Sequence, residues 1–112
     1  MMLTGLRVVE LAEGVAGPLT ACRLADLGAD VVKIEDGDGD WARECPPFID
    51  DGITSAVFFA LNRGKRALAL GDVPEAAGPL LQRLIAGADV LITERGKGEL
   101  AAVGLAGIDE SP

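Results

Sequence analysis

The sequence predicts an α/β fold in which an open parallel sheet carries flanking helices. Short apolar runs alternate with segments of helical periodicity along the whole chain. The stretch 7–34 holds a strand, a helix and a second strand within about 30 residues, which is the length of a βαβ unit. No linker, repeat or low-complexity segment divides the 112 residues, so residues 1–112 form one domain at most.

The first βαβ unit is defined by its turn and by the two ends of its helix. Strands are expected at 7–11 and 31–34, and they should run parallel with a right-handed crossover. Pro18 suits the first helical position, because its missing N–H would have no partner there. Gly28 stands where a helix C-terminus favours positive φ. The apolar face of this helix contains Leu19, Cys22, Leu24, Ala25 and Leu27.

The rest of the chain predicts five further elements. They are a short helix at 54–61, a strand at 67–70, a helix at 74–86, a strand at 88–93 and a short helix at 99–103. Thr54 or Ser55 can cap the first of these helices. Gly78-Pro79 indicates that the regular part of the helix at 74–86 begins only at Pro79. Residues 106–112 have the composition of a loop, so no closing element completes the predicted sheet.

The chain is acidic, and its composition argues against several classes of function. Ten Lys and Arg against 18 Asp and Glu give a net charge of −8, which disfavours nucleic acid and acidic lipid as partners. No apolar run approaches the roughly 18 residues of a membrane span, and no signal peptide precedes the first strand, so we expect a cytoplasmic protein. Histidine is absent, and Cys22 and Cys45 lack a metal or redox spacing, so the sequence identifies no catalytic residue and no metal ligand.

A long acidic, glycine-rich loop follows the second strand. Its alternating Asp36, Asp38 and Asp40 resemble the oxygen ligands of a calcium loop, but the helix-flanked pattern that ends in Glu is missing. A solvated, mobile loop is the simpler interpretation, although a loop of this length in a compact domain is often functional. Trp41 lies in this loop and has no evident role in a core.

In open parallel sheets, ligands bind beyond the carboxyl ends of the strands. Small residues before Pro18 leave the first helix N-terminus open to an anion, and the basic turn of Arg63, Lys65 and Arg66 favours the same kind of ligand. Alternatively, the small residues allow the helix to pack on the sheet, and the basic turn is only solvated. A nicotinamide dinucleotide is a rival ligand, because Glu35 is placed to bind a ribose, but the turn lacks the three-glycine fingerprint.

The chain closely resembles the start of family III coenzyme A transferases in four successive segments, LTGLRVVELAEGVAGPLTACRLADLGADVVKIE, GDWAR, NRGKRALAL and ADVLIT. The family includes formyl-CoA and carnitine CoA transferases and related acyl-CoA racemases. The resemblance runs from Leu3 to Leu105. It implies a Rossmann-like domain whose chain passes through a smaller domain and returns. It also implies coenzyme A bound as acyl-CoA, a carboxylic acid as the second substrate, and an interlocked homodimer.

The resemblance places contacts to coenzyme A on seven residues. These are Val15 and Ala16 before Gly17-Pro18, Leu70 and Gly71 at the adenine end, and Glu94, Arg95 and Gly96 after the fourth strand. Three positions depart from the family. Asp36 stands where an arginine is often found and would repel a phosphate, Glu94-Arg95 replace an Asn-aromatic pair, and Ala102 replaces an arginine.

The family's nucleophile is an aspartate that forms a mixed anhydride and then an enzyme-bound thioester. It lies beyond Pro112 in family members, so no aspartate of this chain inherits the role, and we expect the 112 residues alone to be inactive. The favoured hypothesis is the N-terminal segment of a transferase that moves CoA between acyl groups. The alternatives are an acyl-CoA racemase, whose histidine has no counterpart here, and a non-catalytic CoA-binding or dimerising module.

Overall fold

The computed structural model describes residues 1–71, 74–102 and 104–105, with residues 74–77 described by their backbone alone. Its elements are β1 (Arg7–Leu11), α1 (Ala16–Asp26), β2 (Asp30–Asp36), η1 (Trp41–Glu44), α2 (Ala56–Asn62), β3 (Arg66–Gly71), α3 (Pro74–Ala86), β4 (Val90–Thr93) and α4 (Lys97–Ala102). The predicted order of strands and helices is confirmed, and the 3-10 helix η1 is an addition to it. The predicted helix end at Val103 and the predicted loop 106–112 lie outside the described residues.

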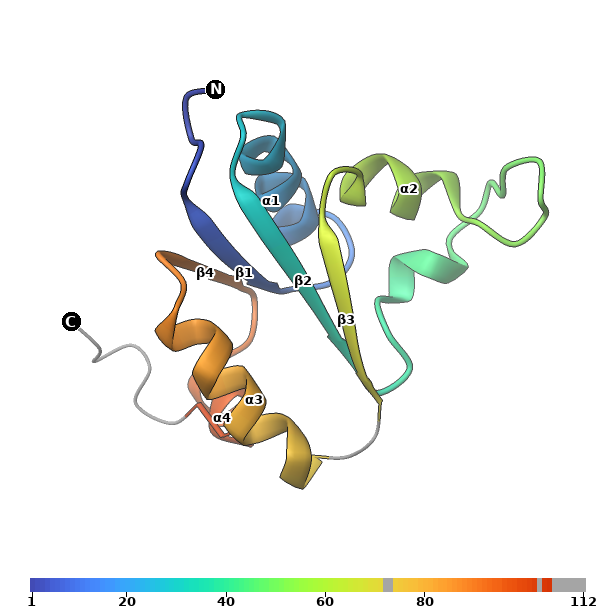
Figure 1. The fold of residues 1–112 in the computed structure, drawn as a ribbon. Helices are drawn as coiled ribbons and strands as arrows, with labels where there is room; N and C mark the ends of the chain where they lie inside the picture. Colours follow the sequence, from blue (N-terminus) through green and yellow to red (C-terminus); the bar gives the residue numbers. More distant parts are fainter. Residues whose placement is uncertain (72–73, 103, 106–112) are drawn as a thin grey trace.

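The four strands form one parallel sheet in the order β3-β2-β1-β4 (Figure 1). β1 pairs with β2 on one side and with β4 on the other, so β3 and β4 are the edges. Because all four strands run in the same direction, the loops that follow them leave from one end of the sheet. The α/β fold class predicted from the sequence is therefore confirmed.

Helices cover both faces of the sheet, with α1 on one face and α3 and α4 on the other (Figure 1). Successive residues of β1 point to opposite faces, so Val8 packs on the α1 side and Val9 on the α3 side. The buried cluster on the α1 side consists of Val8, Ala21, Ala29 and Val31. The buried cluster on the α3 side consists of Val9, Leu11, Ile34, Leu81, Leu100 and Leu105. The small residues of the first cluster allow α1 to pack close to the sheet.

The starts of two helices differ from the prediction. α1 begins at Ala16, so Pro18 is its third residue, where a missing N–H still removes no intrahelical bond. α3 runs from Pro74 through Pro79, so the expectation that it becomes regular only at Pro79 is wrong. We attribute the early start to tertiary packing, because the helix is fixed to the sheet by buried Leu81 and its neighbours.

The segment between β2 and β3 is more structured than a solvated loop. Asp40 caps η1 by accepting the N–H of Ala42 at 2.9 Å. Ser55 caps α2 by accepting the N–H of Phe58 at 3.2 Å, as predicted for Thr54 or Ser55. Asp40 and Ser55 are 2% and 1% exposed. This acidic segment therefore contains two buried polar side chains.

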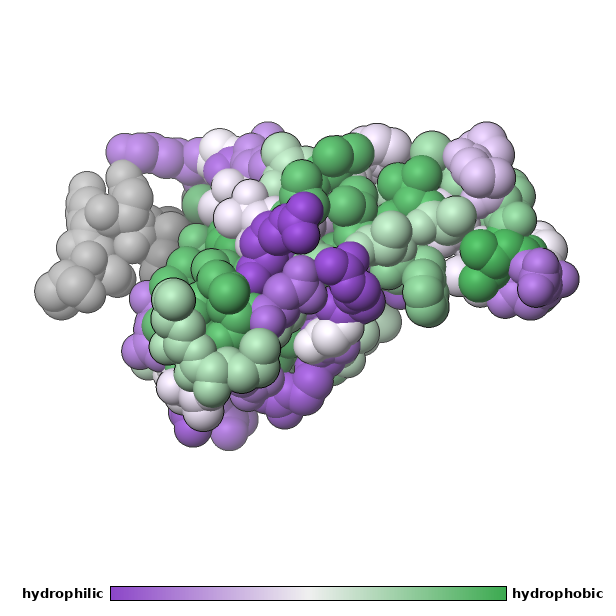
Figure 2. Space-filling model, turned by 90° about the horizontal axis from the view of Figure 1, so that it is seen from above, coloured by the Kyte–Doolittle hydropathy of each residue, from purple (hydrophilic) through white to green (hydrophobic). Residues whose placement is uncertain are grey.

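The surface of the described chain carries apolar side chains that self-association would cover. Ile53 and Phe59 are 81% and 60% exposed, and apolar surface is visible at the right-hand end of Figure 2, where the loop before α2 lies. In the part of the chain that is described, β3 and β4 each pair on one side only. No described helix is both long and apolar enough to span a bilayer.

We therefore expect the isolated chain to self-associate at micromolar concentration, as measured by sedimentation velocity. Replacing Ile53 and Phe59 with serine should shift the distribution toward monomer, because it removes two large, exposed apolar side chains. A sharp wild-type monomer with cooperative unfolding would contradict the expectation.

Candidate functional site

The loops that follow β1, β2 and β4 meet at one end of the sheet. The hydroxyl of Thr93, at the end of β4, donates to the carbonyl of Leu11 at 3.0 Å and accepts the N–H of Arg95 at 3.1 Å. Glu94 and Arg95 then contact α1 and the end of β2, respectively. We call this region the carboxyl-edge site, and it comprises residues 12–17, Asp36 and residues 93–96.

The N-terminus of α1 lies at this site against a carboxylate of the chain itself. The N–H of Gly17 donates to Oε1 of Glu94 at 2.7 Å. Glycine is required here, because a Cβ would lie 2.4 Å from Cβ of Ala12 and 3.0 Å from Oε1 of Glu94. The sequence predicts a place for an anion at this helix N-terminus, and in the structure a glutamate side chain occupies it. A ligand oxygen that uses the Gly17 N–H would have to displace Glu94.

Asp36 and Arg95 form a bidentate pair across the end of β1. The two terminal nitrogens of Arg95 donate to the two carboxylate oxygens of Asp36 at 3.0 and 2.6 Å. Hydrogen bonding from Arg95 lowers the pKa of Asp36 below its ordinary value. The charge of Asp36, which the sequence indicates would repel a phosphate, is therefore neutralised by a neighbouring guanidinium.

The structure gathers most of the residues to which the resemblance assigns coenzyme A contacts. Five of them belong to the carboxyl-edge site, namely Val15, Ala16, Glu94, Arg95 and Gly96. Leu70 and Gly71 lie apart, at the end of β3 on the far side of β2. There the carbonyl of Gly71 accepts the N–H of Gly37 at 3.0 Å. The side chain of Leu70 packs partly buried against the α3-side core, so a ligand at this position would contact its backbone.

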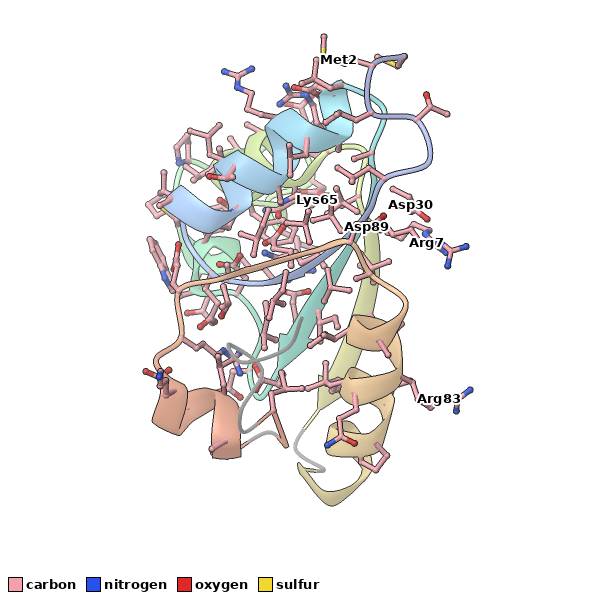
Figure 3. All side chains as sticks on the ribbon, turned by 90° about the vertical axis from the view of Figure 1, so that its left-hand side faces the viewer. Met2, Arg7, Asp30, Lys65, Arg83 and Asp89 are labelled. Atoms are coloured by element: carbon pink, nitrogen blue, oxygen red, sulfur yellow. The ribbon has the colours of Figure 1, made fainter. Side chains whose placement is uncertain are left out.

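The three cations of the basic turn before β3 are already paired. Arg63 lies 2.9 Å from Asp26, and Arg66 lies 2.7 Å from Asp30. Lys65 points inward between α1 and the sheet (Figure 3), where its side chain is 1% exposed. Each cation of this turn therefore has a carboxylate partner within the chain, which argues against the interpretation of the turn as an anion-binding cluster.

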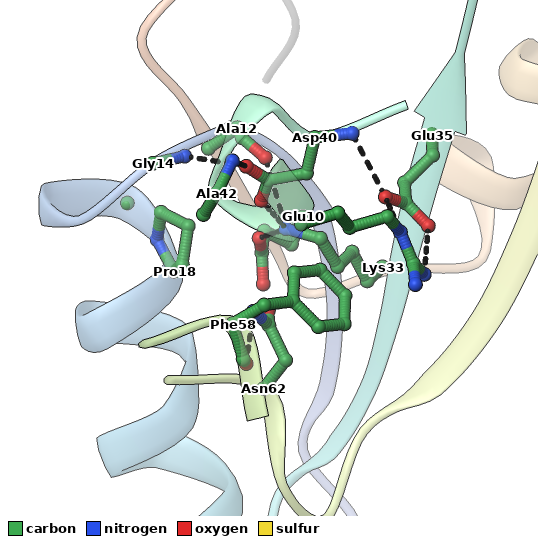
Figure 4. A network of polar contacts seen from close by, with 12 residues as sticks. Glu10, Ala12, Gly14, Pro18, Lys33, Glu35, Asp40, Ala42, Phe58 and Asn62 are labelled. Carbon is green, nitrogen blue, oxygen red and sulfur yellow. Dashed lines mark hydrogen bonds and ion pairs between the residues drawn. The ribbon is translucent and has the colours of Figure 1, made fainter. Parts of the chain in front are cut away.

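Sequence reasoning missed a group of four buried charges beside the carboxyl-edge site; Figure 4 labels Glu10, Lys33 and Asp40 of this group. This buried charge cluster consists of Glu10, Lys33, Asp40 and Lys65, whose side chains are at most 2% exposed. Nζ of Lys33 lies 2.6 Å from Glu10 and 2.8 Å from Asp40. Nζ of Lys65 lies 2.5 Å from the other carboxylate oxygen of Glu10. Two acids and two bases cancel, which is the condition under which proteins bury ions.

Both lysines of the cluster also donate to backbone carbonyls. Lys33 donates to Ala12 at 3.1 Å, and Lys65 donates to Pro18 at 2.9 Å. Within the described chain, Glu10 Oε1 and Asp40 Oδ2 accept no hydrogen bond of good angle, so a lysine ammonium is the only group that compensates each of them. Burial lowers the pKa of Lys65. Removing any one of the four side chains would therefore leave a buried charge without one of its partners.

Part of this cluster has a signal in the sequence. Glu10 shares a strand face with Val8, and Lys33 shares one with Val31, and both valines belong to the core under α1. An acid and a base at core-facing positions of two strands indicate a buried ion pair. Asp40 has no such signal, because nothing in the sequence distinguishes it from the other aspartates of its loop.

A cavity of about 240 Å³ lies at the opposite end of the sheet. None of the residues predicted to contact coenzyme A lines it. It is lined by residues at the strand starts, including Arg7 and Asp30, and by Arg83 and Leu84 of α3. Arg7 and Arg83 point outward and do not converge on it (Figure 3). Among the described residues, no group of three or more acidic or sulfur side chains is arranged to hold a metal ion.

The free energy of unfolding is expected to fall as the pH is lowered from about 6 to 3. Hydrogen bonds from Arg43 and Arg95 lower the pKa of Glu35 and of Asp36, respectively. This stabilisation is complete above the ordinary values of 4.5 and 3.8, and it is lost as the pH falls through the lower values of the folded state. Urea denaturation across the range measures the loss. The double variant Glu35→Gln, Asp36→Asn should show a shallower dependence, and an unchanged slope would contradict the assignment.

Fold and site together define an α/β chain in which strand-end loops and a helix N-terminus meet at one edge of the sheet. Comparison with known proteins gives the family. Residues 3–109 match CoA-transferase family III, and the chain belongs to this family.

Two of its relatives are named as CoA-transferases of succinate or succinyl-CoA and glutarate. The succinate–glutarate CoA-transferase of Agrobacterium fabrum is 40% identical over 110 residues, which cover 92% of this chain and 27% of that protein. The human succinyl-CoA:glutarate CoA-transferase is 35% identical over 105 residues, which cover 92% and 24%. The crystal structure of a CAIB/BAIF family protein from Brucella suis has a TM-score of 0.80 and 41% identity, over 91% of this chain and 28% of that chain. The chain thus spans about a quarter of the length of these relatives.

Proposed function

We propose that this chain forms the N-terminal, coenzyme A-binding segment of a homodimeric enzyme that transfers CoA between carboxylic acids. The observation that carries the proposal is the convergence of the loops after β1, β2 and β4 at the carboxyl-edge site, beside the N-terminus of α1. Parallel sheets bind ligands at this end. Since several relatives are named for succinate and glutarate, short dicarboxylic acids are the substrates to test first.

In the proposed reaction, an aspartate carboxylate outside these 112 residues attacks the carbonyl carbon of the acyl-CoA. The thiolate of CoA leaves, and a mixed anhydride forms. The thiolate then attacks the aspartyl carbonyl of the anhydride, which releases the donor acid and leaves an enzyme-bound thioester. The acceptor acid runs the same two steps in reverse and departs as the new acyl-CoA. Asp40 does not fit the role of nucleophile, because it is buried against Lys33.

The test is the exchange of CoA by the complete protein encoded by the reading frame that contains these residues. Succinyl-CoA and isotopically labelled glutarate should give labelled glutaryl-CoA without net hydrolysis, while the 112-residue chain alone gives none. Thioester hydrolysis without exchange would contradict the transferase. Exchange catalysed by the chain alone would contradict a nucleophile outside it.

Replacing Glu94 with glutamine is expected to strengthen the binding of coenzyme A to the chain by about threefold. CoA carries several negative charges, the chain carries −8, and Glu94 occupies the Gly17 N–H that an anionic group could use. Titration calorimetry at low and at physiological salt measures the change, and the gain should shrink as salt screens the charge.

The matched control for this variant is Asp50→Asn, which removes one negative charge from an exposed loop away from the site. An equal gain in both variants would show an effect of net charge alone. Weaker binding by Glu94→Gln would show that the carboxylate contacts the ligand favourably, and would contradict the prediction.

A further inference from the structure

We propose that Asp40 is a positioning residue, whose single buried carboxylate fixes the loop 12–16 and the 3-10 helix η1 in one arrangement. The loop 12–16 is part of the carboxyl-edge site, and η1 borders it through the contact of Trp41 with Gly14. Among the measurements that test this proposal, only that of coenzyme A affinity rests on the proposed function.

The carboxylate of Asp40 joins two segments that are distant in sequence. Its Oδ1 accepts the N–H of Gly14, in the loop after β1, at 2.9 Å. The same oxygen accepts the N–H of Ala42, in η1, at 2.9 Å. Its Oδ2 lies 2.8 Å from Nζ of Lys33 (Figure 4). One fully buried side chain therefore connects the β1–α1 loop, η1 and strand β2.

The charge of Asp40 restricts it to this orientation. Lys33, its partner, is fixed by Glu10 at 2.6 Å and by the carbonyl of Ala12 at 3.1 Å. Turning the carboxylate toward solvent would remove the only compensation that Asp40 Oδ2 has among the described residues. The ion pair therefore orients the carboxylate through Oδ2, while the two amide bonds depend on Oδ1 alone.

Contacts on the outer side of η1 fix it to β2 and α2 as well. The N–H of Asp40 donates to Oε1 of Glu35 at 2.9 Å, and Arg43 donates to both oxygens of Glu35 at 2.8 and 2.7 Å. The guanidinium of Arg43 lies 3.9 Å from the ring centre of Phe58. η1 is thus bound on two sides, while only Asp40 connects it to the loop after β1 by a side-chain bond that the structure shows.

The position of the Trp41 indole ring depends on the contact between the loop 12–16 and η1. It lies against Gly14, since a Cβ on that glycine would be 2.2 Å from Cζ2 of the ring. Trp41 is 59% exposed. Trp41 is the single tryptophan of the chain, so its fluorescence reports this contact without interference from other indoles.

The test compares the full 112-residue chain with Asp40→Ala and Asp40→Asn. Alanine removes both amide bonds, so acrylamide quenching of Trp41 should rise, by at most about 1.7-fold for a ring that goes from 59% to complete exposure. Coenzyme A affinity should fall about tenfold, as expected when buried N–H groups lose their acceptor. Asparagine retains Oδ1 for both amides, so quenching should return toward the wild-type value even though the ion pair with Lys33 is lost.

The control is Asp51→Ala, because Asp51 also accepts two backbone amides, those of Ile53 and Thr54 at 2.8 Å, but in an exposed loop. It should leave both readouts unchanged. A folded Asp40→Ala variant with wild-type quenching would overturn the proposal, and so would equal effects of alanine and asparagine. If the wild type binds no coenzyme A, the proposed function fails, while the quenching data still decide the role of Asp40.

If Asp40→Ala does not fold, hydrogen exchange on the wild-type chain tests the role of Asp40 instead. The amides of Gly14 and Ala42 should be protected to the same degree, because one carboxylate binds both. An unprotected Gly14 amide would overturn the proposal.

Discussion

Replacing Lys33 with methionine is expected to lower the free energy of unfolding by about 3–5 kcal/mol. Methionine has a similar length, so the loss is electrostatic. Lys33 lies within 2.8 Å of two carboxylates, and its removal leaves Glu10 and Asp40 buried with one ammonium, that of Lys65. Domains of this size have roughly 5–15 kcal/mol of stability in total, so the variant should lose a large share of it. Urea denaturation followed by circular dichroism measures the change.

The matched control is Arg66→Met, which removes a cation from an exposed pair. The side chain of Arg66 is 70% exposed, and it lies 2.7 Å from Asp30. Exposed pairs contribute about 0–1 kcal/mol, so this variant should be close to wild type. Similar losses in both variants would contradict the conclusion that the buried charge cluster is a principal determinant of stability.

Replacing Gly14 with alanine is expected to lower the free energy of unfolding by about 2–4 kcal/mol, from backbone strain and overpacking together. Gly14 has a φ of +82°, which a residue with a Cβ rarely adopts. The new methyl group would also lie 2.2 Å from the ring of Trp41 and must displace it. Thermal unfolding and the emission maximum of Trp41 measure the two effects separately.

Gly5→Ala separates strain from overpacking. Gly5 has a similar φ of +91°, but no atom lies within 4 Å of the position of its Cβ. It should show the strain of about 1–2 kcal/mol without the steric contact, and no change in Trp41 emission. If Gly14→Ala costs no more than Gly5→Ala, the contact between Trp41 and Gly14 does not contribute to stability.

The fold could be predicted because each of its elements has a local cause. The apolar runs of β1 and β2 and the cap of α1 at Leu27-Gly28 depend on residues close together in the chain. The start of α3 could not be predicted in this way, since packing of Leu81 on the sheet outweighs the local effect of Pro79. Local signals therefore predict which elements form better than where they begin.

The site was only partly predictable, because its decisive contacts join distant residues. Position at the strand ends was enough to predict that the loops after β1 and β4 lie at the same end of the sheet. The bond from Gly17 to Glu94 spans 77 positions, however, and no local pattern indicates it. Charge composition was misleading in the same way: the basic turn suggested an anion site, but its cations pair with acids elsewhere in the chain. Which aspartate of the acidic loop turns inward also depends on the position of Lys33 on β2.

Hydrogen exchange with mass spectrometry on the chain, with and without coenzyme A, tests most directly whether the ligand binds at the carboxyl edge of the sheet. The account predicts slower exchange of the backbone amides of residues 12–17 and 93–96 when coenzyme A is bound. Protection confined to the opposite end of the sheet, around Arg7 and Arg83, would contradict it, as would no protection anywhere at saturating coenzyme A.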